Sequence, residues 1–223
     1  MKKIVFATIP MQAVEGPGWD PEGYFYKFEE NKNLEYRNKV HIPVNGVLAN
    51  LLKKNDDVKV VRIYVSNNYS IRNAEIQEKE LRYLNENIGA NLKFEDVSTE
   101  FDETSSTIEQ RFKNLIEKLE DNCEIILDMT YGSKTLVPVL FYVLGFAEKF
   151  FDADIKNILY DKAKFEKRKL EVDGKMIETS TPNPDSCEIF DITSLFYLNS
   201  LTSVMEAPDS KTATERLDRF FKL

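Results

Sequence analysis

The fold of this chain is decided by residues 124–146, which read EIILDMTYGSKTLVPVLFYVLGF. The first five, Glu124–Asp128, are a short apolar run rich in isoleucine, which predicts a buried strand. Leu136–Phe150 is apolar over a length that suits a helix, and Pro138 is tolerated in its first turn. A buried strand that leads through a short loop into a helix is the crossover unit of a parallel sheet.

Similar signals recur on both sides of this stretch. Apolar, β-branched runs predict five more strands, at Lys3–Ile9, Val58–Ser66, Leu92–Val97, Ile155–Tyr160 and Glu188–Ile192. Helical patterns cover Pro43–Lys54, Asn73–Ile88, Ser106–Leu119, Ser194–Glu206 and Lys211–Phe221. Ser106 and Glu109 match a capping box, in which the serine caps a backbone N–H and the glutamate reaches back.

Two segments predict hairpins added to this pattern. Lys162–Glu178 is charged around Asp173-Gly174, a strong hairpin signal, and Tyr24–Ile42 is aromatic and charged around a turn-like centre. Strands that alternate with helices indicate an α/β fold, Rossmann-like and doubly wound, with a mainly parallel six-stranded sheet and helices on both faces. We expect one domain over residues 1–223: a core of 1–165, then 166–223 with the hairpin, the last strand and the C-terminal helices.

Composition excludes several classes of function. Lys and Arg total 30 against 38 Asp and Glu, a net charge of −8, which disfavours binding of long nucleic acid through many phosphate contacts. Two cysteines and one histidine are too few for a disulfide scaffold or a structural zinc site, so we expect no metal or cofactor. The longest apolar stretch, Leu136–Ala147, is too short to span a bilayer, and the N-terminus does not resemble a secretory leader. We therefore expect a cytoplasmic protein that does not bind membranes.

Ligands of open α/β sheets bind beyond the C-terminal ends of the strands. The segments to consider are therefore the loops that follow strands, at Pro10–Gly18, Asn67–Arg72, Ser98–Ser106, Met129–Thr135 and Asp161–Lys164.

The loop Met129–Thr135 has the most specific pattern. Gly132 lets the backbone approach a ligand closely, and the next three residues place hydroxyls, an ammonium group and free N–H groups at a helix N-terminus. This arrangement predicts a phosphate site, although the same residues fit an ordinary turn in which a serine or threonine caps the helix. The loop matches neither the nucleotide P-loop nor the glycine-rich dinucleotide fingerprint.

Other polar and aromatic residues have two interpretations each. Asp128 is more simply explained as an acceptor for N–H groups of its own turn than as a catalytic group. His41 has no evident partner, and Trp19 either stacks on a base or fastens its loop. A basic cluster either holds phosphates or forms an exposed hairpin face; it comprises Lys162, Lys164, Lys167, Arg168 and Lys169.

The pattern Asp128-x-Thr130-x-Gly132, between a strand and an apolar helix, resembles the signature of CRISPR-associated Rossmann-fold (CARF) domains, commonly Asp-x-Thr-His-Gly. The order of the other strands and helices is similar over most of the chain, but this motif of five residues is the specific part. Tyr131 stands where the family has histidine, so any role of that imidazole is lost or altered.

The resemblance implies binding of cyclic oligoadenylate, the second messenger of type III CRISPR defence, with cyclic tetra-adenylate as the default. It also implies a homodimer with the ligand on the two-fold axis, because a symmetric ligand suits a symmetric interface. The residues expected to bind the ligand are Thr8, Pro10, Met11, Gln12, Asn67, Thr130, Tyr131, Gly132 and Thr135.

A CARF chain without a separate effector domain resembles a ring nuclease, which degrades the messenger, and we expect no room here for such a domain. In this reaction the ribose 2′-OH attacks its own phosphodiester without a metal, leaving a 2′,3′-cyclic phosphate. We expect Lys134 to stabilise the developing charge and Ser133 to position the phosphate. The alternatives are a sensor that binds without cleaving, an enzyme acting on another phosphorylated metabolite, and an interaction protein.

Overall fold

The computed structural model describes residues 2–100 and 102–220. Six strands form the main sheet in the order β3-β2-β1-β4-β5-β8, and the first five are parallel. Their bounds are β1 Lys2–Thr8, β2 Asp57–Val65, β3 Asn91–Thr99, β4 Glu124–Asp128, β5 Asp154–Lys162 and β8 Glu188–Asp191. Strand β8 runs antiparallel to β5 at one edge. The predicted α/β fold with a mainly parallel six-stranded sheet is confirmed.

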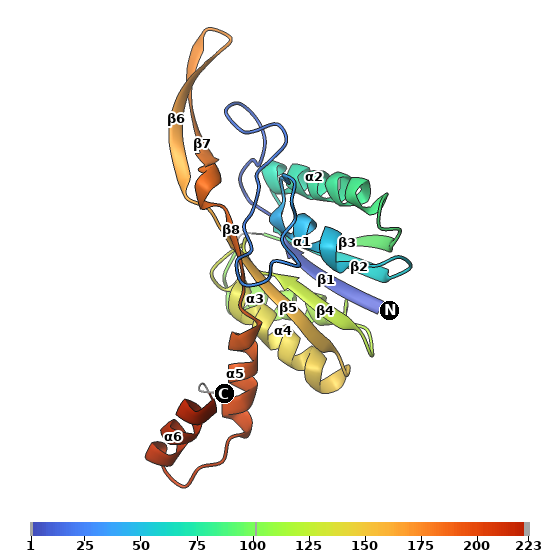
Figure 1. Cartoon of the computed structure of the whole chain (residues 1–223), viewed down its shortest axis with the longest axis vertical. Helices are drawn as coiled ribbons and strands as arrows, with labels where there is room; N and C mark the ends of the chain where they lie inside the picture. Colours follow the sequence, from blue (N-terminus) through green and yellow to red (C-terminus); the bar gives the residue numbers. More distant parts are fainter. Residues whose placement is uncertain (1, 101, 221–223) are drawn as a thin grey trace.

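Helices cover both faces of the sheet (Figure 1). Helices α1 and α2 lie on one face and α3 and α4 on the other; their bounds are α1 Pro43–Leu51, α2 Asn68–Asn85, α3 Ser105–Ile116 and α4 Leu136–Phe150. Alternate residues of β1 show why both faces are apolar: Ile4 and Phe6 belong to the core under α3 and α4, and Val5 and Ala7 to the core under α1 and α2.

Two additions extend from this core. Strands β6 (Phe165–Val172) and β7 (Lys175–Pro182) form the predicted hairpin around Asp173-Gly174, as a separate two-stranded sheet that projects from the body (Figure 1). The short 3-10 helix η1 (Pro184–Ser186) follows. At the other end of the molecule, α5 (Thr193–Val204) and α6 (Ser210–Phe220) extend from the sheet.

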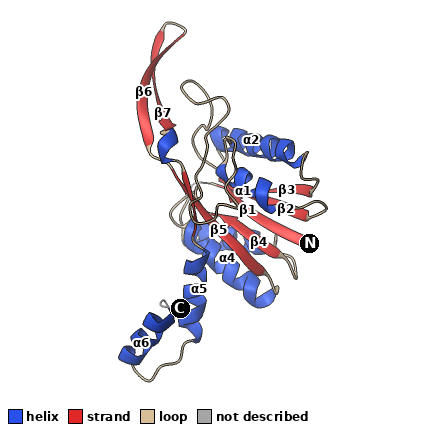
Figure 2. Cartoon of the chain, in the orientation of Figure 1, coloured by secondary structure: helices blue, strands red, loops and turns tan. Residues whose placement is uncertain are grey.

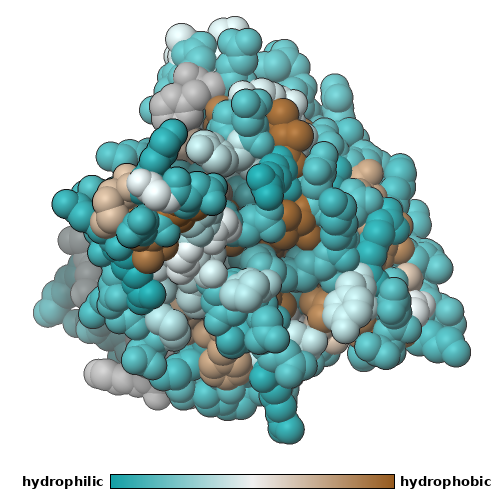
Figure 3. Space-filling model, turned by 90° about the horizontal axis from the view of Figure 1, so that it is seen from above, coloured by the Kyte–Doolittle hydropathy of each residue, from teal (hydrophilic) through white to brown (hydrophobic). Residues whose placement is uncertain are grey.

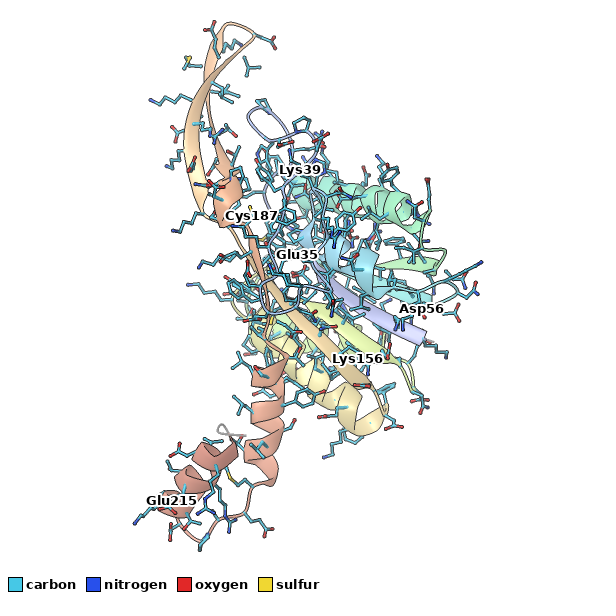
Figure 4. All side chains as sticks on the ribbon, viewed as in Figure 1. Glu35, Lys39, Asp56, Lys156, Cys187 and Glu215 are labelled. Atoms are coloured by element: carbon cyan, nitrogen blue, oxygen red, sulfur yellow. The ribbon has the colours of Figure 1, made fainter. Side chains whose placement is uncertain are left out.

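The segment Tyr24–Ile42 does not form the predicted hairpin. It is drawn as loop in Figure 2, and its one antiparallel bridge joins Tyr24 to Val40. Tyr24, Tyr26 and Phe28 are instead buried against the α1 side of the core. Glu35, labelled in Figure 4, accepts a hydrogen bond from the Phe28 N–H at 2.7 Å. The conformation of this segment is therefore determined by packing against the sheet rather than by strand pairing.

Two predicted helix starts also differ from the structure. Helix α3 is capped by Thr104, whose hydroxyl accepts from the Thr107 N–H, so Ser106 lies inside the helix and the capping box is wrong. Helix α2 begins at Asn68 rather than Asn73, because the Asn67 side chain accepts from the Ser70 N–H at 2.9 Å and caps it. Among the described residues, no helix combines the length and apolar character needed to cross a membrane.

Candidate functional site: a cavity at the ends of the central strands

A cavity of about 390 Å³ opens beyond the C-terminal ends of β1, β4 and β5. The sheet order reverses between β1 and β4, and such switch points are where ligands of α/β sheets bind. The lining residues come mainly from three of the five loops singled out in the sequence, with others from the hairpin and from the segment between β1 and α1. They are Pro10–Val14, Trp19, Tyr26, His41, Thr130–Gly132, Tyr160–Ala163, Phe165 and Pro182. Seen from above, the surface is largely hydrophilic with small hydrophobic patches set among polar side chains (Figure 3).

The loop after β1 is held in place by α2. The carbonyl oxygens of Pro10 and Gln12 both accept from the Asn73 side-chain amide, at 2.9 and 2.7 Å. Pro10, Met11 and Gln12, which are predicted to bind the ligand, line the cavity. Asn67, also expected to bind the ligand, is not among the lining residues: its side chain caps α2, which carries Asn73.

Thr8 supports the site from below. Its side chain is buried, and its hydroxyl oxygen accepts from the Tyr131 N–H at 2.9 Å, which fastens the loop after β4 to the end of β1. Thr130, Tyr131 and Gly132 line the cavity from that loop. The φ angle of Gly132 is +117°, which residues with a side chain rarely adopt. The backbone conformation therefore requires glycine at this position.

Two buried carboxyl groups organise the same loop. Thr130 donates from its N–H and its hydroxyl to Asp128 Oδ1, at 3.1 and 2.6 Å. Asp128 thus accepts from its own turn, as the simpler interpretation of the sequence expected. The Asp161 N–H donates to the Thr130 hydroxyl at 2.9 Å, and the Tyr131 hydroxyl donates to Asp161 Oδ2 at 3.1 Å. The phenol of Tyr131 therefore points at a carboxyl group where the CARF signature has histidine.

Burial changes the acid–base properties of these groups. Removal from water raises the pKa of Asp128 to about 8, with a further contribution from the charge of Asp161. The same cause raises the pKa of Asp161 to about 6, and hydrogen bonds from Thr130 and Tyr131 oppose the rise.

Ser133, Lys134 and Thr135 do not line the cavity. Ser133 is buried, and its hydroxyl accepts from Arg111 of α3 at 3.2 Å; the Thr135 hydroxyl contacts Ser133 at 3.1 Å and Glu103 at 3.2 Å. Thr135 stands at the N-cap position of α4, but its side chain makes no capping hydrogen bond within the described part of the chain. The loop thus joins α3 to α4 through polar side chains, and its Lys134 side chain is exposed.

Arg111 was missed by the sequence reasoning, although a signal was present. It is 2% exposed and falls on the apolar face of its helix, between Ile108 and Leu115 at helical spacing. A charged residue at such a position is almost always paired when buried. Burial lowers the pKa of its guanidinium, while Glu103 and Asp102 oppose this change.

The remaining residues have defined partners. His41 contacts Glu80 of α2 at 3.2 Å, and this hydrogen bond raises the pKa of the imidazole. Trp19 lies edge-on to Tyr24 and Phe165, with ring centroids 5.8 and 6.4 Å away, so it fastens its loop and also lines the cavity. Of the basic cluster, Lys162 lines the cavity, and Lys167–Lys169 lie on the exposed hairpin.

Residues 2–100 and 102–220 contain no group of three His, Cys, Asp or Glu side chains placed to hold a metal ion. Comparison with known proteins adds no identification, because no protein-family model and no curated protein matches the chain.

Proposed function

We propose that this chain binds cyclic oligoadenylate in the cavity at the ends of β1, β4 and β5. The observation that carries the proposal is that the cavity is lined by Thr130–Gly132, in the loop that contains the CARF-like motif, and by the loop after β1. These are the two segments that the resemblance to CARF domains names as ligand-binding. The proposal keeps the cytoplasmic localisation expected from the sequence.

The chemistry of the lining suits a nucleotide. Trp19, Tyr26 and Phe165 offer aromatic surfaces for adenine, and Lys162 offers a cation for phosphate. A volume of about 390 Å³ lies at the lower end of the range of ligand pockets, roughly 300–1,000 Å³. One protomer can therefore hold part of the ring, and we propose that a second copy, related by a two-fold axis, holds the rest.

Cleavage of the bound ring is a second candidate function, and the exposed side chain of Lys134 is the observation that favours it. This side chain is exposed two residues beyond Gly132 and forms no ion pair within the described part of the chain, so its ammonium group is free to approach a phosphate outside the cavity. In the reaction, the 2′-oxygen forms a bond to phosphorus and the bond to the 5′-oxygen breaks. The 2′-OH proton goes to solvent, and solvent protonates the leaving oxygen. Lys134 would stabilise the charge on phosphorus-bound oxygen.

Ser133, assigned to position the phosphate, is engaged with Arg111 instead. We therefore propose that Ser133 and Arg111 act by fixing the backbone of the loop that presents Lys134. Without a positioned general base, turnover would be slow, since such a base contributes about 10²–10⁴-fold.

The experiment mixes the purified chain with cyclic tri-, tetra- and hexa-adenylate in EDTA. Calorimetry measures binding, and chromatography with mass spectrometry measures products. We expect Lys162→Ala to weaken binding about tenfold. Lys134→Ala is expected to reduce cleavage far more than binding, and Lys169→Ala, on the exposed hairpin, is the matched control.

Linear products with a 2′,3′-cyclic phosphate would establish a ring nuclease. Stable binding of an intact ring would establish a sensor that acts through a partner. Absence of binding to all three rings would reject the proposal in favour of an enzyme on another phosphorylated metabolite or an interaction protein.

A further inference from the structure

Asp128 and Asp161 border the same narrow gap at the floor of the cavity, and Asp161 also lines the cavity. The register of β4 and β5 pairs Asp128 with Leu159, and Asp161 follows two residues later on the same face of the sheet. Asp128 is 2% exposed and Asp161 8% exposed. Both carboxyl groups border one narrow gap under the first turns of α1, and the other residues around it are Pro43, Val44, Val47, Leu159 and Ile189.

Each carboxyl group has one oxygen satisfied and one without a partner. Oδ1 of Asp128 accepts from Thr130, and Oδ2 of Asp161 accepts from Tyr131. The other two oxygens, Asp128 Oδ2 and Asp161 Oδ1, are buried and have no hydrogen-bond partner among the described residues. A buried, unpartnered oxygen is costly, and more so if its group is charged.

No cation compensates these groups within residues 2–100 and 102–220. Neither carboxyl group forms an ion pair with a lysine, arginine or histidine there. The side chains that α1 and β8 place against the two carboxyl groups are apolar. The titratable neighbours on the other elements are Tyr26, Tyr131 and Cys187. All three are neutral at pH 7, because their pKa values are raised. Of the basic groups that line the cavity above, His41 is bound to Glu80 and Lys162 lies over the Phe190 ring.

The gap also limits what else can neutralise the pair. It contains no space for a water molecule, so neither a bridging water nor a hydrated ion fits between the two groups without a rearrangement of α1. A proton needs no such space. Protonation of one group converts one of the two unpartnered acceptors at this gap into an O–H donor.

We infer that Asp128 and Asp161 share one proton at neutral pH, and that this proton fastens the Thr130–Gly132 loop and makes ligand binding in the cavity dependent on pH. Burial raises the pKa of both groups, and the charge of Asp161 raises the pKa of Asp128 further. Loss of the proton leaves two negative charges in an apolar gap, directly beneath the loop that both groups hold by hydrogen bonds.

The effect on binding rests on the proposed function. Phosphodiesters stay ionised between pH 6 and pH 9, so the charge of the ligand does not change over this range. The charge beneath the cavity does change, and a second negative charge repels an anionic ligand. At roughly 10 Å and an effective dielectric of about 35, one extra charge corresponds to about a fivefold loss of affinity.

The first test uses the ligand-free wild-type chain, so it is independent of the proposed function. Infrared spectroscopy at pH 7 is expected to show the C=O stretch of a protonated carboxyl group, which disappears as the pH is raised to 9. Its absence at pH 7 would overturn the inference, and this result needs no variant.

The second test compares unfolding of the wild type with Asp128→Asn. The asparagine keeps an acceptor for Thr130 and imitates the protonated group with an N–H donor. Between about pH 6.5 and pH 7.5 the folded wild type holds one more proton than the unfolded chain, because Asp128 is protonated and Asp161 is ionised. Its unfolding constant should therefore rise about tenfold per pH unit relative to Asp128→Asn. Equal slopes in the two proteins would contradict the shared proton; His41 contributes equally to both and cancels.

The third test measures the affinity for cyclic tetra-adenylate at pH 7 and pH 9. We expect about a fivefold loss in the wild type, in which Asp128 ionises over this range, and no loss in Asp128→Asn, in which the remaining Asp161 is ionised at both pH values. The same loss in both would reject the coupling to binding. If neither protein binds the ring at any pH, the proposed function fails, and the first two tests still decide the shared proton.

Discussion

Glu80 of α2 takes the place of a missing cap on α1, and its removal is expected to destabilise the protein strongly. Helix α1 begins at Pro43 after Ile42, which has no side chain able to cap it. The Glu80 carboxylate accepts instead from the N–H groups of His41 and Ile42, at 2.7 and 3.2 Å, and from the Asn45 amide at 2.9 Å. A carboxylate at this position also favours the positive end of the helix dipole.

The magnitude follows from the donors that Glu80→Ala leaves without a partner. Ile42 and Asn45 are fully buried, and a buried unpaired donor costs about 1–3 kcal/mol. The Asn45 amide keeps its bond to the Gln77 carbonyl, so the Ile42 N–H carries most of the loss, and loss of the capping interaction adds about 1 kcal/mol. We expect Glu80→Ala to reduce the free energy of unfolding by about 3 kcal/mol, and Glu80→Gln, which keeps one acceptor, by about half as much.

Urea unfolding at pH 7, followed by circular dichroism, measures this difference. Glu75→Ala is the matched control, because Glu75 lies on the same helix, is exposed, and should change stability by less than about 0.5 kcal/mol. A loss below about 1 kcal/mol for Glu80→Ala, or one equal to that of Glu75→Ala, would refute the capping role.

Two further predictions concern the rim of the cavity. The His41–Glu80 hydrogen bond raises the pKa of His41, so its contribution to stability is fully present below about pH 6.5 and disappears as the pH rises through the folded-state pKa. His41→Gln should therefore destabilise the protein more at pH 5.5 than at pH 9 in chemical denaturation, and an equal loss at both would contradict this. Gly132→Ala should cost about 1–3 kcal/mol, since φ is +117° and the new Cβ would lie 2.5 Å from Leu136 Cδ2. Gly145→Ala in α4, where a Cβ meets nothing within 4 Å, should instead stabilise the protein by about 0.5–1 kcal/mol. Thermal unfolding of both variants tests whether the two stability changes have opposite signs.

Local sequence patterns were sufficient to predict most strands of the sheet. Strand β4 and helix α4 have the bounds that the apolar runs Glu124–Asp128 and Leu136–Phe150 predicted, because burial on both faces requires continuous apolar residues. The β6–β7 hairpin followed from Asp173-Gly174, since a tight turn depends on its own residues. The start of α3 was predicted wrongly, because Thr104 and Ser106 both suit a cap and the preceding loop decides between them.

The candidate site likewise has features that the sequence predicts and features that depend on tertiary packing. The sequence predicts a buried strand that ends at Asp128 and a following loop with Thr130 and Gly132, and ligands of such sheets are expected at that loop. Three other contacts depend on which elements pack together: Ser133 with Arg111, Glu80 with the start of α1, and Asp161 with Asp128 around one gap. Strand periodicity and turn chemistry are local properties of the chain. The partner of a buried charge comes from whichever element packs against it, and that is set by the sheet order rather than by spacing along the chain.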